Sequence, residues 1–148
     1  MAAALAPTKE GRFLLPGNNR KPADVLILHW SGGRDTALDV TVVNPLQVGM
    51  VAKAAKTPGY ALGEAFRIKV RKAGEDCRRQ GIAFVPLACE SLGRWHEVTV
   101  TEVEKLASTL ARQTGQEEGE ARGQLWQKLS ILLMKDNAAL LCNIIPDQ

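Results

Sequence analysis

The sequence lacks the features that identify several large classes of protein. No apolar run reaches the length of a transmembrane helix, and the N-terminal MAAALAP has no basic segment of the kind that begins a signal peptide. The cysteines number three, at unrelated spacings, which argues against a disulfide framework and against a zinc site. We therefore expect an intracellular protein with reduced, mostly buried thiols, nuclear if the host is eukaryotic, with no membrane partner.

Two familiar catalytic motifs are also missing. The segment SGGRD at residues 31–35 lacks the second glycine and the Lys-Ser/Thr pair of a phosphate-binding P-loop. Ser31 and Ser91 stand outside any nucleophile-elbow sequence. No small-molecule cofactor is expected.

The length and the charge distribution describe one domain with a basic first half. A chain of 148 residues is enough for a single hydrophobic core. We expect a tail or arm over 1–20 and one domain over 21–148, divided into a core (21–95) and a helical part (96–148). The net charge is +3, with most basic residues in the first 80 positions and most acidic residues later. A solvated face is the commoner explanation of such asymmetry, and an anionic ligand is the more specific one.

Hydrophobic periodicity predicts alternating strands and helices. Gly81 ends the first helix, Pro86 favours an edge position for the third strand, and Thr99 with Glu102 forms a capping box at the second helix. The order strand, strand, helix, strand, helix, helix is predicted at about residues 24–30, 36–43, 61–80, 82–88, 99–115 and 121–145. This order indicates an α/β domain, or alternatively α+β, built on a small mixed sheet with flanking helices.

Two aspartates lie in the predicted hairpin, Asp24 at the start of its first strand and Asp39 inside the second. A period of two places Asp39 and Thr41 on one face of their strand, so that Val40 and Val42 can pack on the other. Asp24 can then approach Asp39 across the hairpin. Two neighbouring carboxylates repel unless a cation neutralises both, and Mg²⁺ (or Mn²⁺) prefers such oxygen ligands.

The helix that follows carries basic residues. Lys69 and Lys72 are three apart and share a face, and Glu64 is either a further acid or an intrahelical partner. Two metal-binding acids and a nearby lysine suit attack on a phosphodiester. The structural alternatives are a turn or cap role for the aspartates and a solvated basic face for the helix.

The runs KPADVLI, GRDTALDVTVV and EAFRIKVRKA, with GIAFVPLACESLGRW after them, resemble the restriction-endonuclease-like domain at the C-terminal end of some non-LTR retrotransposon polyproteins. That domain is similar to the PD-(D/E)XK nuclease fold, and the resemblance covers about residues 20–140. It implies that Asp24 and Asp39 bind metal, that Lys69 is the catalytic lysine, and that Thr41 stands where more typical members keep their lysine.

Together these observations predict a Mg²⁺-dependent DNA endonuclease of retrotransposon origin. The Val40 carbonyl is a candidate third metal ligand, and Glu64 and Thr41 are further candidates for the site. The candidate DNA-binding residues are Arg20, Lys21, Arg34 and Lys72. The alternatives are a catalytically inactive nucleic-acid-binding remnant and a fragment without function, and the oligomeric state stays open.

Overall fold

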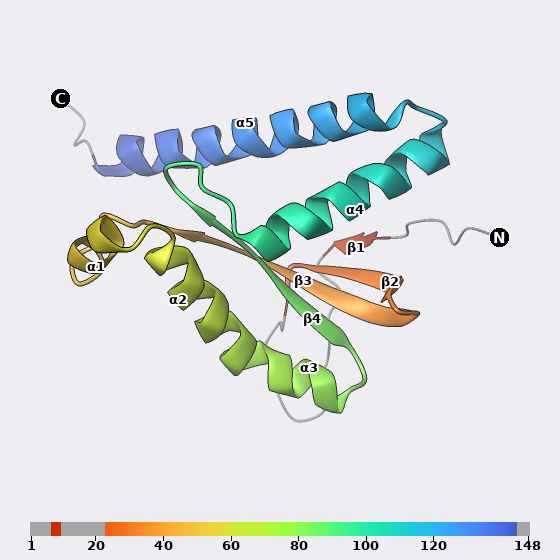
Figure 1. Ribbon diagram of the computed structural model, residues 1–148, viewed down its shortest axis with the longest axis horizontal. Helices are drawn as coiled ribbons and strands as arrows, with labels where there is room; N and C mark the ends of the chain where they lie inside the picture. The colour runs from red at the N-terminus through yellow and green to blue at the C-terminus, as the bar shows by residue number, and fades with distance from the viewer. Residues whose placement is uncertain (1–6, 10–22, 145–148) are drawn as a thin grey trace.

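The computed structural model describes residues 7–9 and 23–144 (Figure 1). Its elements are β1 (Pro7–Lys9), β2 (Val25–Ser31), β3 (Arg34–Val43), α1 (Val51–Lys56), α2 (Tyr60–Lys69), the π-helical segment η1 (Val70–Gly74), α3 (Glu75–Arg79), β4 (Ala83–Glu90), α4 (Glu97–Thr114) and α5 (Glu118–Ile144). In Figure 1 the helix formed by α2, η1 and α3 runs below the sheet, whereas α4 and α5 lie above it. The predicted mixed α/β organisation with two C-terminal helices is confirmed.

The sheet has four strands in the order β1-β2-β3-β4. The pairings β1–β2 and β2–β3 are antiparallel, and β3–β4 is parallel, with α1, α2, η1 and α3 in the connection between them. Since β4 is the last strand in this order, Pro86 lies on an edge strand, as predicted. The prediction for residues 1–20 was incomplete, because Pro7–Lys9 forms a strand that pairs with β2.

A glycine pair makes the turn between β2 and β3. Gly32 and Gly33 have φ of 59° and 76°, the left-handed values that a two-residue hairpin loop of this type requires. The hairpin is irregular before the turn: Ser31 pairs with Arg34, but the next recorded pair is Ile27 with Thr36. Three residues of β2 therefore oppose only Asp35, whose carboxylate accepts a hydrogen bond from the backbone N–H of His29 at 3.0 Å.

The helix predicted over 61–80 is present as α2, η1 and α3, which follow one another without a break from Tyr60 to Arg79. It widens to π geometry at Val70–Gly74. Its buried Cys77 clusters with Ala23 and Ala37 of the β2–β3 hairpin region, and Phe84 of β4 packs against this cluster. Burial raises the pKa of the Cys77 thiol, with a smaller contribution from the nearby charges of Asp76 and Asp39.

The predicted capping box of α4 is wrong. The N-cap is His96, whose Nδ1 accepts a hydrogen bond from the Val98 N–H at 3.2 Å. Thr99 is instead buried, and its hydroxyl bridges the backbone of Ala88, accepting from the N–H at 2.8 Å and donating to the carbonyl at 3.2 Å. These two contacts give hydrogen-bond partners to backbone groups on the outer edge of β4. The sequence around Thr99 does not reveal that these backbone groups of β4 need a partner.

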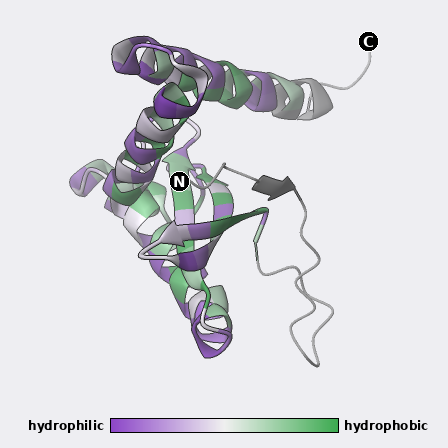
Figure 2. Ribbon diagram, turned by 90° about the vertical axis from the view of Figure 1, so that its right-hand side faces the viewer, coloured by the Kyte–Doolittle hydropathy of each residue, from purple (hydrophilic) through white to green (hydrophobic). Residues whose placement is uncertain are grey.

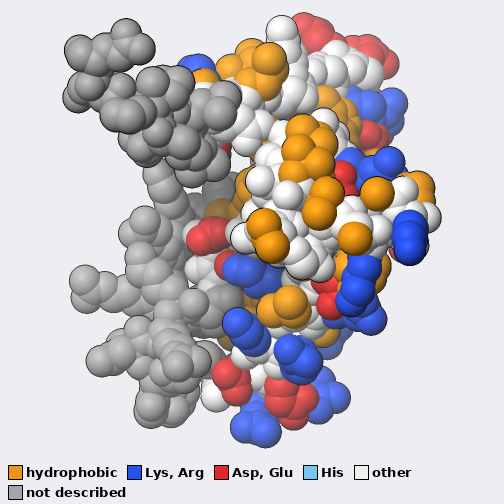
Figure 3. All heavy atoms as spheres, turned by 90° about the vertical axis from the view of Figure 1, so that its left-hand side faces the viewer, with side chains coloured by type: hydrophobic (Ala, Val, Ile, Leu, Met, Phe, Trp, Pro, Cys, Tyr) orange, Lys and Arg blue, Asp and Glu red, His pale blue; other side chains and the backbone are white. Residues whose placement is uncertain are grey.

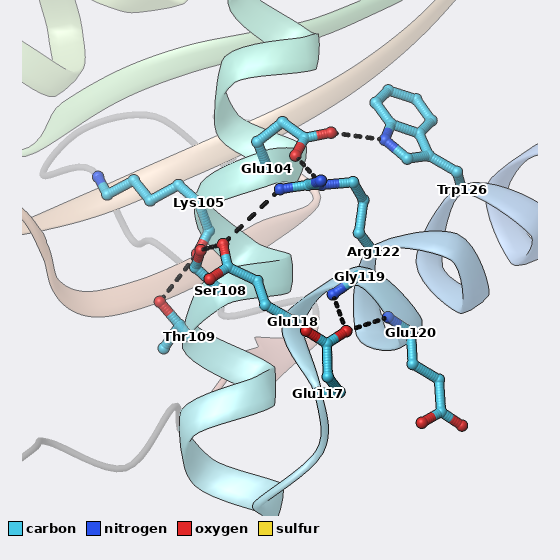
Figure 4. A network of polar contacts seen from close by, with 10 residues as sticks. All are labelled: Glu104, Lys105, Ser108, Thr109, Glu117, Glu118, Gly119, Glu120, Arg122 and Trp126. Atoms are coloured by element: carbon cyan, nitrogen blue, oxygen red, sulfur yellow. Dashed lines mark hydrogen bonds and ion pairs between the residues drawn. The ribbon is translucent and has the colours of Figure 1, made fainter.

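Helices α4 and α5 form a hairpin that Gly115 closes at φ 70°. Glu104 joins the two helices, because its Oε2 pairs with Arg122 Nε at 2.5 Å and its Oε1 accepts from Trp126 Nε1 at 2.9 Å (Figure 4). The hydrogen bond from Trp126 and the contact with Arg122 lower the pKa of the Glu104 carboxyl. Figure 2 shows hydrophilic and hydrophobic residues mixed along both helices, in accord with a hairpin that is partly held by polar contacts.

Candidate active site

The structure brings Asp24 and Asp39 together across the hairpin. Val25 pairs with Leu38, and Asp24 directly precedes Val25, so it lies beside the stretch of β3 that contains Asp39. The backbone N–H of Asp24 donates to the Leu38 carbonyl at 3.1 Å. The Oδ2 atom of Asp24 in turn accepts from the Val40 N–H at 2.9 Å, which holds the carboxylate against β3.

The irregularity in β2 determines which residues of β2 lie opposite which residues of β3. Had the register of the Ser31–Arg34 pair continued unchanged along β2, Leu26 would stand opposite Asp39, and Asp24 would stand opposite Thr41. The extra residues of β2 around His29, which has φ 53°, shift the pairing by two positions. The approach of the two aspartates is thus a product of the bulged strand.

Lys69, the last residue of α2, lies beside the two aspartates. Its Nζ lies 2.6 Å from Asp39 Oδ2, and the side chains are 35% and 13% exposed respectively. An ion pair that is largely shielded from water is stronger than one on an open surface. The three residues Asp24, Asp39 and Lys69, which we call the acid–lysine cluster, therefore come from three separate segments and meet at one place on the sheet.

Each aspartate keeps one carboxylate oxygen free within the described residues. Asp24 uses Oδ2 for the Val40 N–H, and Asp39 uses Oδ2 for Lys69, so an Oδ1 atom of each has no recorded partner. Among residues 7–9 and 23–144, no three His, Cys, Asp or Glu side chains gather closely enough to hold a metal by themselves. Two carboxylates fit Mg²⁺, which binds through one or two carboxylates and keeps several waters.

The remaining candidates divide into those near the cluster and those elsewhere. Thr41 is half-buried two residues beyond Asp39 on the same face of β3. Glu64 pairs with Arg67 on its own helix, which supports the intrahelical alternative. Arg34 is exposed at the start of β3, and Lys72 is exposed in η1. Arg20 and Lys21 lie outside the described residues.

The valines of β3 depart from the predicted pattern. Leu38 is buried, but Val40 and Val42 are 49% and 45% exposed, so the expectation that this apolar set packs together was wrong. The described part of β2 begins at Val25, opposite Leu38, and within the described residues nothing extends the antiparallel pairing to Val40 and Val42. The strand thus becomes accessible directly beyond the aspartates.

Gly74 and Phe84, which lie next to the cluster, were not singled out from the sequence. Arg71 and Gly74 follow Lys69 on η1, and with Phe84 of β4 they line an open groove. A glycine within a helical pattern is an available signal, since glycine lowers helix stability by about 1 kcal/mol relative to alanine. His96, by contrast, caps α4 and stacks on Phe66 with ring centroids 4.2 Å apart.

Comparison of the chain with protein-family models, with curated proteins and with solved structures finds no match. None of the helices in the described part of the chain combines the length and the apolar character needed to cross a membrane. The function has to be argued from the site itself.

Proposed function

We propose that the protein is a metal-dependent DNA endonuclease of the PD-(D/E)XK type and of retrotransposon origin, which hydrolyses a phosphodiester and nicks DNA. The observation that carries this proposal is the acid–lysine cluster, in which Asp24 and Asp39 each keep a free carboxylate oxygen beside the ammonium of Lys69. The resemblance in sequence assigns these same three residues to metal binding and catalysis. The mixed sheet, with a helical connection between parallel β3 and β4, is compatible with that fold.

Asp24 and Asp39 would hold Mg²⁺ or Mn²⁺, with the Val40 carbonyl as a third ligand. The N–H of Val40 points to Asp24, and the N–H and C=O of one strand residue point to the same side of the strand, so this carbonyl is directed toward the aspartates. A bound ion would supply Lewis acidity at the phosphoryl group and a more acidic water at neutral pH.

Lys69 supplies the positive charge that hydrolysis requires from the protein. Water adds across one ester bond of the phosphodiester: its oxygen bonds to phosphorus, the bond to one deoxyribose oxygen breaks, and that oxygen takes up a proton. Negative charge grows on the phosphoryl oxygens during this step, and a positioned ammonium stabilises it. Asp39 holds Lys69 at the end of α2, where the ammonium can turn from the carboxylate to the substrate.

Exposed basic residues near the cluster would bind the DNA backbone. Figure 3 shows Lys and Arg side chains gathered over the lower part of one face, which α2, η1 and α3 form. Arg34 at the start of β3 and Lys72 in η1 are exposed and have no acidic partner among the described residues. Contacts of this kind give affinity that falls with salt, with a log–log slope of about −0.9 for each phosphate contacted. Arg20 and Lys21 are proposed to contribute likewise, and a DNA substrate would call for a nuclear location in a eukaryotic host.

A binding module without catalysis is the second candidate. The observation in its favour is that the described residues offer two carboxylates and no third, with one of the two already paired to Lys69. Such a remnant would keep salt-dependent DNA binding and lose strand scission.

A nicking assay on supercoiled plasmid separates the two candidates. The wild-type protein should relax the plasmid with Mg²⁺ or Mn²⁺ and fail to do so in EDTA. Asp39→Asn should cut about 10² to 10³ times more slowly, the loss expected for one main electrostatic element. Asp136→Asn, an exposed carboxylate on α5, is the matched control and should cut like the wild type. A folded wild type that binds DNA but cuts with neither ion would establish the binding module instead.

A further inference from the structure

An open groove with a basic rim lies between the η1–α3 segment and the start of β4. Its rim carries three arginines, Arg34, Arg71 and Arg78, and its floor contains Val70, Gly74 and Phe84. The rim residues come from three different elements, β3, η1 and α3. We refer to these six residues as the arginine groove.

Most of the positive charge on the rim is uncompensated. Arg78 pairs with Glu75 at 2.5 Å, and this contact lowers the pKa of the Glu75 carboxyl. Within the described residues, Arg34 and Arg71 are exposed and make no ion pair. Glu75 also lines the groove, so its three arginines and one glutamate leave a net charge of +2, which favours an anionic ligand.

The floor of the groove is apolar and partly aromatic, and a glycine keeps it open. A Cβ added at Gly74 would lie 3.5 Å from Val70 Cγ1 and 3.8 Å from Phe84 Cδ1, which are ordinary contacts. The Cβ itself would fit, and a longer side chain would extend from a point already in contact with Val70 and Phe84. Phe84 is half-buried, so part of its ring remains available.

The arginine groove adjoins the acid–lysine cluster. Phe84 pairs with Ala37 across the parallel strands, and two residues further on Pro86 pairs with Asp39. Two residues along a strand span about 7 Å. On the helix side, Val70 of the groove directly follows Lys69. A nucleic-acid strand that leaves the cluster along this helix would enter the groove.

We propose that the arginine groove binds an unpaired stretch of the DNA strand next to the cleavage point, with phosphates on Arg34 and Arg71 and a base against Phe84. This inference rests on the proposed nuclease function and names its substrate class, DNA with an unpaired segment beside the nick. A duplex presents sugars and phosphates to a protein surface and leaves an apolar floor uncovered, whereas an unpaired strand offers a base that stacks on an aromatic ring. The combination of arginine rim and aromatic floor favours the unpaired strand.

Binding of a fluorescent oligothymidylate, followed by anisotropy in EDTA, tests the groove without any cleavage. Gly74→Met keeps every charge and fills the groove, and Arg34→Ala with Arg71→Ala keeps the space and removes the charges. Each variant should raise the Kd about tenfold, the scale of one lost stacking or phosphate contact. Gly74→Ala adds only the Cβ and should have a smaller effect than Gly74→Met. The double variant Lys128→Ala with Lys135→Ala removes two exposed charges from α5 and should leave the Kd within about twofold of the wild type.

Two outcomes would overturn the inference. If Gly74→Met binds the oligonucleotide as tightly as the wild type while folded by circular dichroism, the groove is not the binding site. If the α5 double variant weakens binding as much as the arginine double variant does, the effect is one of net charge.

A cleavage assay then tests whether DNA bound in the groove is cut at the acid–lysine cluster. The wild type should cut a duplex with a central unpaired tract faster than the same duplex fully paired, and Gly74→Met should bring the ratio of the two rates close to one. A ratio of one in the wild type would overturn the substrate assignment. The nuclease proposal fails in a different way. If the wild type cuts no DNA but binds oligothymidylate, and Gly74→Met and the arginine double variant weaken that binding, the groove proposal stands and the endonuclease proposal is wrong.

Discussion

The acid–lysine cluster and the α4–α5 hairpin both pair carboxylates with cations, yet they use the carboxylate oxygens differently. In the hairpin, one carboxylate oxygen of Glu104 pairs with Arg122 and the other accepts a hydrogen bond from Trp126, so both oxygens have a partner. In the cluster, Asp24 and Asp39 each use only one oxygen within the described residues. A satisfied carboxylate holds two elements together, whereas a carboxylate with a free oxygen can also bind a ligand.

Burial strengthens the contrast. The side chain of Asp39 is 13% exposed, while that of Glu104 is 35% exposed on the outside of a helical hairpin. Keeping a carboxylate away from water costs free energy unless partners compensate fully. The cluster keeps one incompletely paired carboxylate in the more shielded of the two places.

The largest expected difference between the two regions is in catalysis. Asp39→Asn should lower the plasmid nicking rate by about two to three orders of magnitude, because it removes a charge from the metal-binding pair. Glu104→Gln should leave the nicking rate unchanged while lowering thermal stability. Equal nicking rates for Asp39→Asn and the wild type, or equal losses in both variants, would remove the functional distinction between the regions.

The role of Lys69 separates a catalytic pair from a structural one. Lys69→Met should lower nicking by about 100-fold, the scale for one lost electrostatic element. The same change removes the cation that competes with a metal ion for Asp39, so added Mg²⁺ should raise the melting temperature of this variant more than that of the wild type. For comparison, Lys128→Met on α5 should alter neither quantity. A variant that melts earlier but responds to Mg²⁺ like the wild type would indicate a structural ion pair.

Local sequence patterns predicted much of this arrangement. The Gly-Gly turn, the two strands beside it, the helix at 60–79 and the edge position of Pro86 all follow from residue preferences within a few positions. Burial of Cys77 and Cys89 as reduced thiols is confirmed as well, and burial raises the pKa of Cys89 to about 11. Proximity of Asp24 and Asp39 was also expected from the hairpin.

Other features depend on contacts that sequence spacing does not reveal. The bulge near His29 sets the register that aligns Asp24 with Asp39, and nothing in an alternating pattern fixes its position. The local sequence around Thr99 and Glu102 matches a capping box, but the hydroxyl of Thr99 is hydrogen-bonded to the backbone of Ala88. The carboxylate of Glu102 accepts a hydrogen bond from Trp30 Nε1 at 2.7 Å. At the start of α4, distant partners outweighed the local capping preference of about 1 kcal/mol.

A third prediction concerns stability at the boundary between the sheet and the helices. Thr99→Val keeps the shape of the side chain and leaves the N–H of Ala88 without its partner, whereas the Ala88 carbonyl keeps the hydrogen bond from the His96 N–H at 3.0 Å. The free energy of unfolding should fall by about 1–3 kcal/mol. Thr101→Val is the matched control, because Thr101 is exposed and bonds only to Glu97 of its own helix; its effect should stay within about 0.5 kcal/mol. Urea denaturation measures both. Equal effects would mean that the bridge to Ala88 adds nothing to stability.

The smallest effect is expected from protonation of the hairpin carboxylate. The pKa of Glu104 is lower in the folded protein than its ordinary value, chiefly because of the hydrogen bond from Trp126 and then because of Arg122. Such a group stabilises the fold at pH values above its unfolded pKa of about 4.3, and this contribution disappears as the pH falls through the folded value.

The free energy of unfolding of the wild type, measured in urea between pH 6 and pH 3, should therefore fall more steeply than that of Glu104→Gln. Glu120→Gln, which changes an exposed carboxylate on the same hairpin, should keep the wild-type slope. If the slopes of all three proteins coincide, Glu104 is an ordinary surface acid, and the contrast with the acid–lysine cluster would then rest on Asp24 and Asp39 alone.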